Sequence, residues 1–418
     1  MTKSAVWGNI PIDVLRSSRD NVSKHRMCGR KCRLRVFLMM GGEMADGQKK
    51  ILYVASSFGH LAAFHQPYMK WFAEQGCTVH AAAGGDRREL QGVVRYISLP
   101  FEKSMYSQRN LAAAWRLRQL VQREGYDLIS LHTSLAAFFA RLALLPPCRN
   151  RPTVMNTSHG YLFDRDSTRL KRMLLLGAER LTAPVTDWLL VMNQQDREIA
   201  NRYRLGENIV FTRGMGVDLA RFQPATREMR QMARDSMRVQ PDELVLVYAA
   251  EFSERKNQKM LIRAMQDLPD SVILLLPGEG ALLEPCKMLA KELGVSGRVR
   301  FPGFVRNVED YYAAADLCVS ASRIEGLPFN VMEAMACGLP VVLSDIKGHQ
   351  DLVSGGQNGI LYPYDDIPAF VKAVERLLDE QTRQLMAVAA YRAAQPYGLE
   401  TVYPTLTGIY QTALHGHA

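Results

Sequence analysis

Two glutamates, Glu325 and Glu333, stand eight positions apart in the run EGLPFNVMEAMACGLPVV. An apolar segment ends just before this run, and residues 329–336 within it have a helical pattern. One carboxylate therefore lies in a strand-to-helix loop and the other about two helical turns further on. The helix start offers free backbone N–H groups that suit a phosphate. Two hydroxyl acceptors around an anion site fit a nucleotide sugar, which carries hydroxyls at both ends and phosphates in the middle.

From residue 51 onward, short apolar runs alternate with helical patterns, which is typical of buried parallel strands joined by helices. The alternation occurs twice and predicts an α/β fold with two Rossmann-like, doubly wound domains facing a cleft. The expected strands are 51–56, 77–83, 127–132, 153–158, 188–192 and 208–212, followed by 244–250, 272–276, 298–301, 316–320, 339–343 and 359–362. The expected helices include 62–75, 111–123, 196–203, 257–266 and 282–293.

A chain of 418 residues exceeds what one core usually organises, so two domains are expected. Gly216, Pro224 and Pro241 punctuate a polar stretch between the halves. The predicted parts are an extension at 1–48, a first domain at 49–216, a second domain at 217–396 and a segment at 397–418 that packs back on the first domain.

The extension lacks steady periodicity and carries 9 basic and 4 acidic side chains. Two interpretations remain open. It is either a disordered basic tail, or an artefact of a start codon assigned too early, with Met44 as the true start. The second interpretation rests on Gly-Gly-Glu just before Met44, whose codons can spell a ribosome-binding sequence.

Composition excludes several classes of protein. No stretch approaches the roughly 20 apolar residues that span a bilayer, and residues 36–40 are too short for the apolar core of a secretory signal. Cys28 and Cys32 form the only close cysteine pair, so we expect neither a zinc site nor disulfides, and a reducing, cytoplasmic setting.

Several residues of the second half follow predicted strands, where ligands bind in open α/β sheets. Arg255 and Lys256 could hold a phosphate, although a solvated helix start is the commoner fate of such a cluster. Gly278 lies in a turn that lets backbone approach a ligand. Val305 lies in a loop whose backbone could pair with a base edge, and Gly326, followed by Leu327, lets the chain pass close to a bound group.

The run EGLPFNVMEAMACGLPVVLSD resembles the donor-site signature of the retaining glycosyltransferases of family 4, which have the glycosyltransferase-B fold. The resemblance extends from about residue 50 to the end of the chain. It implies that Glu325 contacts the donor sugar, Glu333 the ribose and Lys256 the pyrophosphate. One position departs from the pattern, because Glu251 stands where many members have an arginine, so either Arg255 takes over that role or Lys256 and helix N–H groups suffice. The resemblance also implies that residues 49–216 form the acceptor domain and residues 217–396 the donor domain.

In the first half, the resemblance implies that Gly59 lies in a loop between the donor phosphates and the acceptor. His159 matches the histidine near the anomeric carbon and is expected to be catalytic together with Lys256 and Glu325. His65 could touch the acceptor or be structural, and His132 is expected to give structural support.

The resemblance further implies transfer of a hexosyl or N-acetylhexosaminyl group from a nucleotide-diphosphate sugar, expected to be UDP-linked, with retention and without a metal or other cofactor. The expected acceptor is a glycan or a polyprenyl-pyrophosphate-linked glycan of a bacterial exopolysaccharide, capsule or O-antigen. Two alternatives stay open: a nucleotide-sugar epimerase of the same fold, and a non-catalytic regulator that binds nucleotide sugars.

The charge is uneven, because residues 49–216 carry a net charge of +10 and residues 217–396 a net charge of −4. Residues 109–123 and 165–176 mix basic and apolar side chains. Such stretches suit an anionic membrane surface, although each could also be a core-facing helix with a solvated basic side. We therefore predict peripheral binding to the inner face of the cell membrane. The sequence shows no nucleic-acid-binding pattern.

Overall fold

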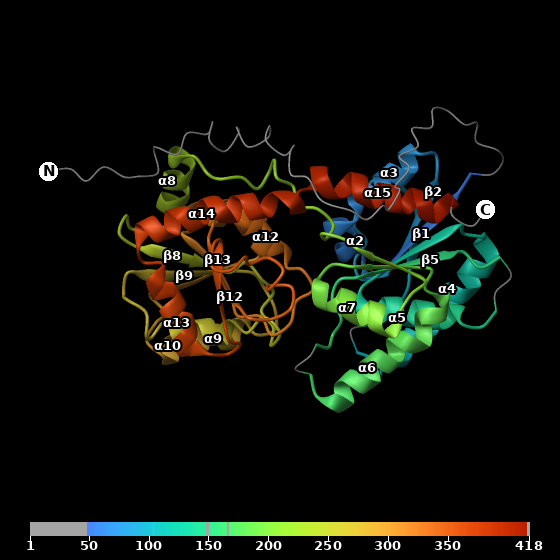
Figure 1. Cartoon of the computed structure of the whole chain (residues 1–418), viewed down its shortest axis with the longest axis horizontal. Helices are drawn as coiled ribbons and strands as arrows, with labels where there is room; N and C mark the ends of the chain where they lie inside the picture. Colours follow the sequence, from blue (N-terminus) through green and yellow to red (C-terminus); the bar gives the residue numbers. More distant parts are fainter. Residues whose placement is uncertain (1–47, 103, 148–149, 165–166, 416–418) are drawn as a thin grey trace, which may run out of the picture.

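A computed structural model gives the fold and describes residues 48–102, 104–147, 150–164 and 167–415. Residues 1–47, which include Met44 and nearly all of the predicted extension, lie outside the described residues, as do residues 165 and 166 of the second basic stretch. Figure 1 shows two lobes side by side, the first in blue and green and the second in yellow to red.

Each lobe is built on a sheet whose neighbouring strands all pair in parallel. The first sheet has the strand order β3-β2-β1-β4-β5-β6-β7, and the second has the order β10-β9-β8-β11-β12-β13. The predicted pair of doubly wound α/β sheets is therefore confirmed. The strands of the first sheet are β1 (Lys50–Ser57), β2 (Thr78–Gly84), β3 (Val93–Ser98), β4 (Leu128–His132), β5 (Thr153–Ser158), β6 (Trp188–Val191) and β7 (Asn208–Phe211). Those of the second are β8 (Leu244–Val247), β9 (Val272–Pro277), β10 (Val299–Gly303), β11 (Leu317–Ser320), β12 (Val341–Ser344) and β13 (Gly359–Tyr362).

Helices cover both sheets, as the buried, apolar central strands require. The helices of the first lobe are α2 (Phe58–Phe64), α3 (Gln66–Glu74), α4 (Gln108–Glu124), α5 (Ser134–Leu144), α6 (Arg169–Thr182) and α7 (Gln194–Tyr203). The second half of the chain adds α8 (Arg227–Ser236), α9 (Gln258–Ala264), α10 (Leu283–Glu292), α11 (Val308–Ala314), α12 (Phe329–Ala336), α13 (Ile367–Arg376), α14 (Glu380–Ala394) and α15 (Leu399–His415).

Two sequence predictions about local structure were wrong. Strand β3 was missed because it is an edge strand with a solvated face, on which Val94 is 71% exposed, so it lacks a continuous apolar run. The single helix expected at 62–75 is two helices, α2 and α3, that meet at His65. Pro67 explains the break, since a proline fits the first turn of a new helix and not the interior of a longer one.

The last helix, α15, leaves the second lobe and lies along α3 of the first (Figure 1). Its Tyr410 is fully buried, with its ring 5.1 Å from the ring of Phe72. The C-terminal helix thus belongs to the core of the first lobe, and the chain crosses twice between the lobes.

The strand orders also say where a ligand should bind. In each sheet the order reverses between two central strands, β1 and β4 in the first and β8 and β11 in the second. Loops that leave such a pair of strands at the carboxyl edge diverge to opposite faces and leave a crevice. The two crevices are formed by the segments that follow β1, β4, β8 and β11, and these segments face one another.

Candidate active site

A cleft of about 440 Å³ lies between the two crevices, within the range of small-molecule binding sites. Its walls come from both lobes. The first lobe supplies His60, Phe64, Thr133, Ser134, His159, Gly160, Tyr161 and Leu162. The second supplies Ala249, Ala250, Glu251, Arg255, Lys256, Ile324, Glu325, Gly326, Leu327, Pro328, Phe329 and Asn330.

On the second lobe, one carboxylate holds two cations. Lys256 Nζ donates to Glu325 Oε1 at 2.6 Å, and Arg255 Nη1 donates to Glu325 Oε2 at 2.9 Å. Ser322 Oγ adds a hydrogen bond to Oε1 at 2.7 Å. The loops after β8 and β11 bring these groups together because the two strands are neighbours in the sheet. Three predicted site residues thus form one cluster in the cleft wall.

Charge, rather than burial, determines the protonation state of this cluster. Burial alone would raise the pKa of Glu325, but Lys256 and Arg255 outweigh it and lower the pKa to about 2. For Lys256, burial would lower the pKa, and the negative charge of Glu325 reverses this, so the pKa is raised. Glu325 and Lys256 are therefore both charged at neutral pH, and a bound phosphate would compete with Glu325 for the two cations.

The opposite wall carries His159, at the end of β5, and His60, in the first turn of α2. Their Nε2 atoms are 3.3 Å apart, so one ring can donate to the other. Burial lowers the pKa of His60 to about 4 and holds that of His159 well below its usual value. Both rings are therefore neutral at pH 7, and the ring that donates to the other has a second nitrogen that can accept a hydrogen bond from a sugar hydroxyl.

Behind these two rings lie His65 and His132, both fully buried. Their ring centroids are 3.6 Å apart. An acceptor in the cleft would reach His65 only if the side chains in front of it moved, so the structure gives no support to the predicted contact. A hydrogen bond of 2.9 Å joins His132 Nε2 and Ser130 Oγ.

Within the described residues, one group of side chains has the spacing to hold a metal ion. It consists of His60, His65 and His159, which offer nitrogen atoms within 4.8 Å of one another. The group lies on the first lobe, across the cleft from the Lys256 cluster. Lys256 and Arg255 already supply positive charge on the second lobe, so a phosphate there has counter-charges without a metal ion.

Glu333, the second glutamate of the opening motif, lies on α12, one turn beyond the lining residue Asn330. Tyr312 donates to Glu333 Oε2 at 3.2 Å. Burial raises the pKa of Glu333 to about 7, although the hydrogen bond from Tyr312 opposes the shift. Its carboxylate therefore changes charge within the physiological range.

Two of the remaining predicted site residues, Gly326 and Leu327, line the cleft directly. The other three, Gly59, Gly278 and Val305, are not among its lining residues. Gly59 is exposed next to the lining residue His60. Gly278 has φ +150°, and a Cβ there would lie 2.0 Å from the carbonyl oxygen of Ala250, so it supports the cleft wall from behind. Val305 is partly buried in the loop after β10.

The two lobes touch at the floor of the cleft, through contacts that no sequence pattern revealed. A Cβ on Gly326 would lie 1.7 Å from the carbonyl oxygen of His159, so only glycine permits this approach. Lys347 reaches from the second lobe to the carbonyl oxygens of Tyr161 and Phe163 at 2.6 and 2.8 Å. It also donates to Asp196 Oδ1 at 2.8 Å, and this ion pair is almost fully buried.

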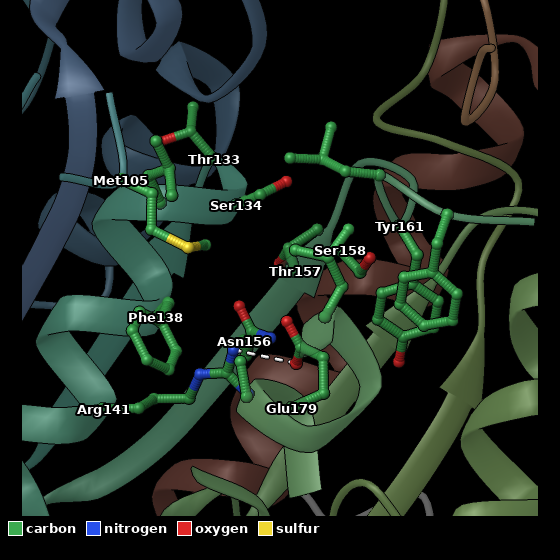
Figure 2. Close-up of a pocket in the computed structure, with 15 residues that line it drawn as sticks. Met105, Thr133, Ser134, Phe138, Arg141, Asn156, Thr157, Ser158, Tyr161 and Glu179 are labelled. Atoms are coloured by element: carbon green, nitrogen blue, oxygen red, sulfur yellow. Dashed lines mark hydrogen bonds and ion pairs between the residues drawn. The ribbon is translucent and has the colours of Figure 1, made fainter. Parts of the chain in front are cut away.

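A side pocket opens from the cleft into the first lobe (Figure 2). The cleft and the side pocket share four lining residues, Thr133, Ser134, Tyr161 and Leu162. Figure 2 shows the ion pair of Arg141 and Glu179 at one end of the side pocket, with an N···O distance of 2.9 Å.

The two basic stretches of the first lobe differ in structure. In α4, Leu117, Leu120 and Val121 are buried in the core, as a core-facing helix requires. In α6 only Thr182 is buried. One face of α6 presents exposed apolar side chains, namely Leu170, Met173, Leu174 and Leu181, which are 53–64% exposed. Among the residues that the structure describes, every helix is too short or too polar to cross a bilayer.

Comparison with known families gives two matches that together span both lobes. Residues 68–221 match the model described as Glycosyltransferase Family 4, and residues 229–395 match that of Glycosyl transferases group 1. The first match covers most of the first lobe, and the second contains the Glu325 loop, α12 and the Lys256 segment.

Curated relatives carry related names. The putative glycosyltransferase EpsD of Bacillus subtilis (strain 168) is 34% identical over 79% of this chain and 87% of its own length. An Escherichia coli enzyme named UDP-Gal:alpha-D-GlcNAc-diphosphoundecaprenol alpha-1,3-galactosyltransferase is 25% identical over 65% of this chain and 71% of its own.

Solved structures share the fold. Sucrose-phosphate synthase from Thermosynechococcus elongatus superposes with a TM-score of 0.73 at 22% identity, over 88% of this chain and 100% of its own. HepE of Anabaena, in complex with UDP-glucose, gives a TM-score of 0.71 at 20% identity, over 87% of this chain and 99% of its own.

Proposed function

The chain belongs to glycosyltransferase family 4, and on that basis we propose that it moves a sugar from a UDP-linked donor to a glycan or polyprenyl-pyrophosphate-linked acceptor, with retention. The observation that carries the proposal is the cluster of Lys256, Arg255 and Glu325, which faces His159 across the cleft between the lobes. The cluster offers two cations for a pyrophosphate and one carboxylate for a sugar hydroxyl.

In the proposed reaction, the bond between the anomeric carbon and the β-phosphate oxygen breaks while the acceptor oxygen bonds to that carbon on the same face. The proton of the acceptor hydroxyl passes to the leaving phosphate, so no enzyme base is consumed. Lys256 and Arg255 stabilise the negative charge that develops on the leaving diphosphate. This role needs no metal or other cofactor, and we propose that none takes part.

Each remaining group has a place in the same proposal. Once phosphates engage the two cations, Glu325 is released from them and can accept a hydroxyl of the donor sugar. Glu333, on α12, takes the ribose hydroxyls. The neutral ring of His159 lies near the anomeric carbon and accepts from the sugar. Gly59, Gly278 and Val305 shape the donor site through their backbone.

A UDP-linked donor is supported by the bound ligand of HepE and by the donor in the galactosyltransferase name. The acceptor of that relative is a diphosphoundecaprenol-linked sugar, and EpsD and a lipopolysaccharide core glycosyltransferase of Rhizobium meliloti are further relatives. We accordingly place the reaction in the assembly of a surface polysaccharide, on the inner face of the cell membrane.

Helix α6 supports the membrane part of the proposal. Its apolar face is exposed, and Arg169, Lys171 and Arg180 flank it on the surface. A basic helix with an exposed apolar face suits the boundary of an anionic bilayer. In Figure 1, α6 lies on the side of the first lobe away from α15.

A thermal-shift panel of nucleotide diphosphates and UDP-sugars, followed by turnover with lipid-linked acceptors, tests the proposal. We expect selective stabilisation by UDP-linked compounds and release of UDP that depends on acceptor. Conversion of the donor without acceptor would favour an epimerase. Binding without turnover of any acceptor would favour a non-catalytic regulator, and no stabilisation by any nucleotide would contradict the donor site itself.

A further inference from the structure

The side pocket in the first lobe contains a buried polar atom that lacks a partner. Asn156 is 3% exposed, and its Oδ1 has no hydrogen-bond partner among the described residues. Buried side-chain oxygens are rarely left unpaired, because the lost hydration costs about 1–3 kcal/mol. An unpaired acceptor that lines a pocket therefore points to a ligand that brings a donor.

The register of β5 explains why Asn156 faces the pocket. Alternate residues of a strand point to opposite faces, and Val154 packs in the cluster formed with α4 and α5 whereas Met155 packs on the other side of the sheet. Asn156 shares the face of Val154. Figure 2 shows its side chain next to the Arg141–Glu179 pair.

The ion pair at the closed end argues for an uncharged ligand. Arg141 is fully buried and also donates to the carbonyl oxygen of Ala137 at 3.2 Å. Its charge is matched by Glu179, so the end of the pocket is close to neutral. A carboxylate or phosphate entering here would have to displace Glu179 from a buried pair, which is costly.

The rest of the pocket is apolar and small. Met105, Phe138 and Leu175 form its walls. Its volume is about 40 Å³, room for roughly three to four non-hydrogen atoms, since one water needs roughly 10–15 Å³. The pocket therefore combines apolar walls and no net charge with three buried polar atoms that lack a partner among the described residues, namely Asn156 Oδ1 and the hydroxyl oxygens of Thr157 and Tyr161.

From this combination we infer that the side pocket binds the acetamido group of an N-acetylated acceptor sugar. The acetamido N–H donates to Asn156 Oδ1, the carbonyl oxygen accepts from Ser158 or Ser134, and the methyl group packs against Phe138 and Met105. The inference rests on the proposed function and narrows the acceptor to a sugar that bears an acetamido group.

The position of the pocket favours the acceptor over the donor as the source of this group. The pocket lies in the first lobe and joins the cleft on the side of His159, whereas the cations for the donor phosphates lie in the second lobe. Helix α6 supplies Leu175, Ala178 and Glu179 to the pocket, so an acceptor held there would lie beside the proposed membrane surface.

Saturation-transfer NMR tests the inference without turnover. The probes are methyl N-acetylglucosaminide and methyl glucoside, which differ at C2, each added to the full chain with UDP present. We expect the acetyl methyl protons to receive the strongest saturation in the wild-type protein and methyl glucoside to bind about tenfold more weakly, as the loss of one buried hydrogen bond implies. Equal binding of the two probes, or weak saturation of the acetyl methyl group, would overturn the inference.

Two variants locate the site. Asn156→Leu removes the unpaired oxygen, and Ala178→Leu fills the pocket from α6, so each should abolish the preference for the acetylated probe. The matched control is Thr212→Val, which removes a buried hydroxyl that lacks a partner, as Asn156 Oδ1 does, but lies outside the pocket, and it should keep the preference. If Asn156→Leu fails to fold, the Ala178→Leu variant alone tests the inference, and an unchanged preference for the acetylated probe in that variant would contradict it.

A second pair of probes, UDP-glucose and UDP-N-acetylglucosamine, separates acceptor from donor. If the variants weaken only UDP-N-acetylglucosamine, the pocket belongs to the donor and the inference is wrong. Transfer rates are measured separately, with acceptor sugars that carry or lack an acetamido group. Equal rates with both kinds of sugar would contradict the inference and leave the proposed function intact. Absence of transfer with preserved NMR preference would sink the proposed function alone.

Discussion

Glu325 holds Lys256 and Arg255 at hydrogen-bonding distance in the cleft wall. In the proposed donor site, the carboxylate keeps these two cations aimed at one place before the phosphates arrive. It would also compete with those phosphates for the cations. Nucleotide binding and sugar transfer therefore make opposite demands on Glu325.

Replacing Glu325 by Gln should separate these two demands. The amide keeps the shape but loses the charge that competes with phosphate, so we expect UDP to bind at least as tightly as to the wild type. Transfer should fall by about a hundredfold, a loss typical of a missing polar contact in the transition state. Calorimetry with UDP and a UDP-release assay measure the two effects.

The matched control is Glu254→Gln, because Glu254 pairs with the neighbouring Lys259 at the surface. It should change neither quantity. Weaker UDP binding by Glu325→Gln would contradict the competition between Glu325 and phosphate.

The raised pKa of Glu333 predicts that donor binding depends on pH. Its pKa is raised to about 7 by burial, so the carboxylate is largely protonated at pH 6 and largely ionised at pH 8. Because in the proposed site the ionised form accepts from both ribose hydroxyls, UDP-glucose should bind about tenfold more weakly at pH 6 than at pH 8. UDP-glucose is the suitable probe, since its phosphate diesters do not titrate in this range.

Glu333→Gln should lose this dependence, and Glu380→Gln, on the exposed start of α14, should keep it. Calorimetric titrations at four pH values give the comparison. An unchanged slope in Glu333→Gln would assign the titrating group elsewhere.

At the scale of elements, α6 stands out as a helix whose apolar face has no cover within the described chain. The double change Leu170→Glu and Met173→Glu puts acids on that face without touching the core. We expect the protein to lose flotation with vesicles of anionic phospholipid at low salt, because both the apolar contact and the charge attraction weaken.

The control changes the exposed methionines of α8, Met229 and Met232, to glutamate. These side chains are 48% and 65% exposed and lie in the other lobe, so flotation should persist. Equal loss with both pairs would indicate a general charge effect, and a wild-type protein that does not float would disprove the membrane surface.

The sequence predicts the elements that have a clear apolar periodicity or that belong to a motif. The buried strands β1, β4, β8 and β11 are continuous apolar runs and were predicted, as was α12. The edge strand β3 was missed because its exposed face hides the pattern. The split at His65 needed recognition that Pro67 starts a new helix.

The candidate site was predictable only in part, because a local pattern identifies single residues and not the contacts between distant segments. Motif spacing identified Glu325 and Lys256, but their pairing across 69 residues depends on β8 and β11 being neighbours, which no local pattern encodes. Asn156 gave no sequence signal, because an asparagine near a strand end reads like any polar residue. Lys347 and Asp196, 151 residues apart, were missed for the lack of any shared motif.

At the scale of the whole molecule, Lys347 ties the lobes together. Its ammonium group contacts Asp196 and two carbonyl oxygens of the other lobe, and burial lowers its pKa despite Asp196. Domain closure in two-lobed enzymes depends on such contacts. The buried pair therefore favours the closed cleft.

Lys347→Met keeps the length of the side chain and removes the charge. We expect a larger radius of gyration by small-angle scattering in the absence of ligand and a higher KM for donor, because binding must now close the cleft unaided. The control Lys372→Met changes an exposed lysine of α13. Scattering and KM identical to those of the wild type would show that the pair does not hold the lobes.

The whole account depends on the cleft being a nucleotide-diphosphate site built around Lys256. Calorimetric titration of UDP into the wild type, Lys256→Ala and Lys259→Ala tests this directly. We predict one site in the wild type, unchanged affinity in Lys259→Ala, and at least tenfold weaker binding in Lys256→Ala, because a charge-assisted hydrogen bond contributes about 1.5–3 kcal/mol. Equal affinity in all three proteins would contradict the assignment.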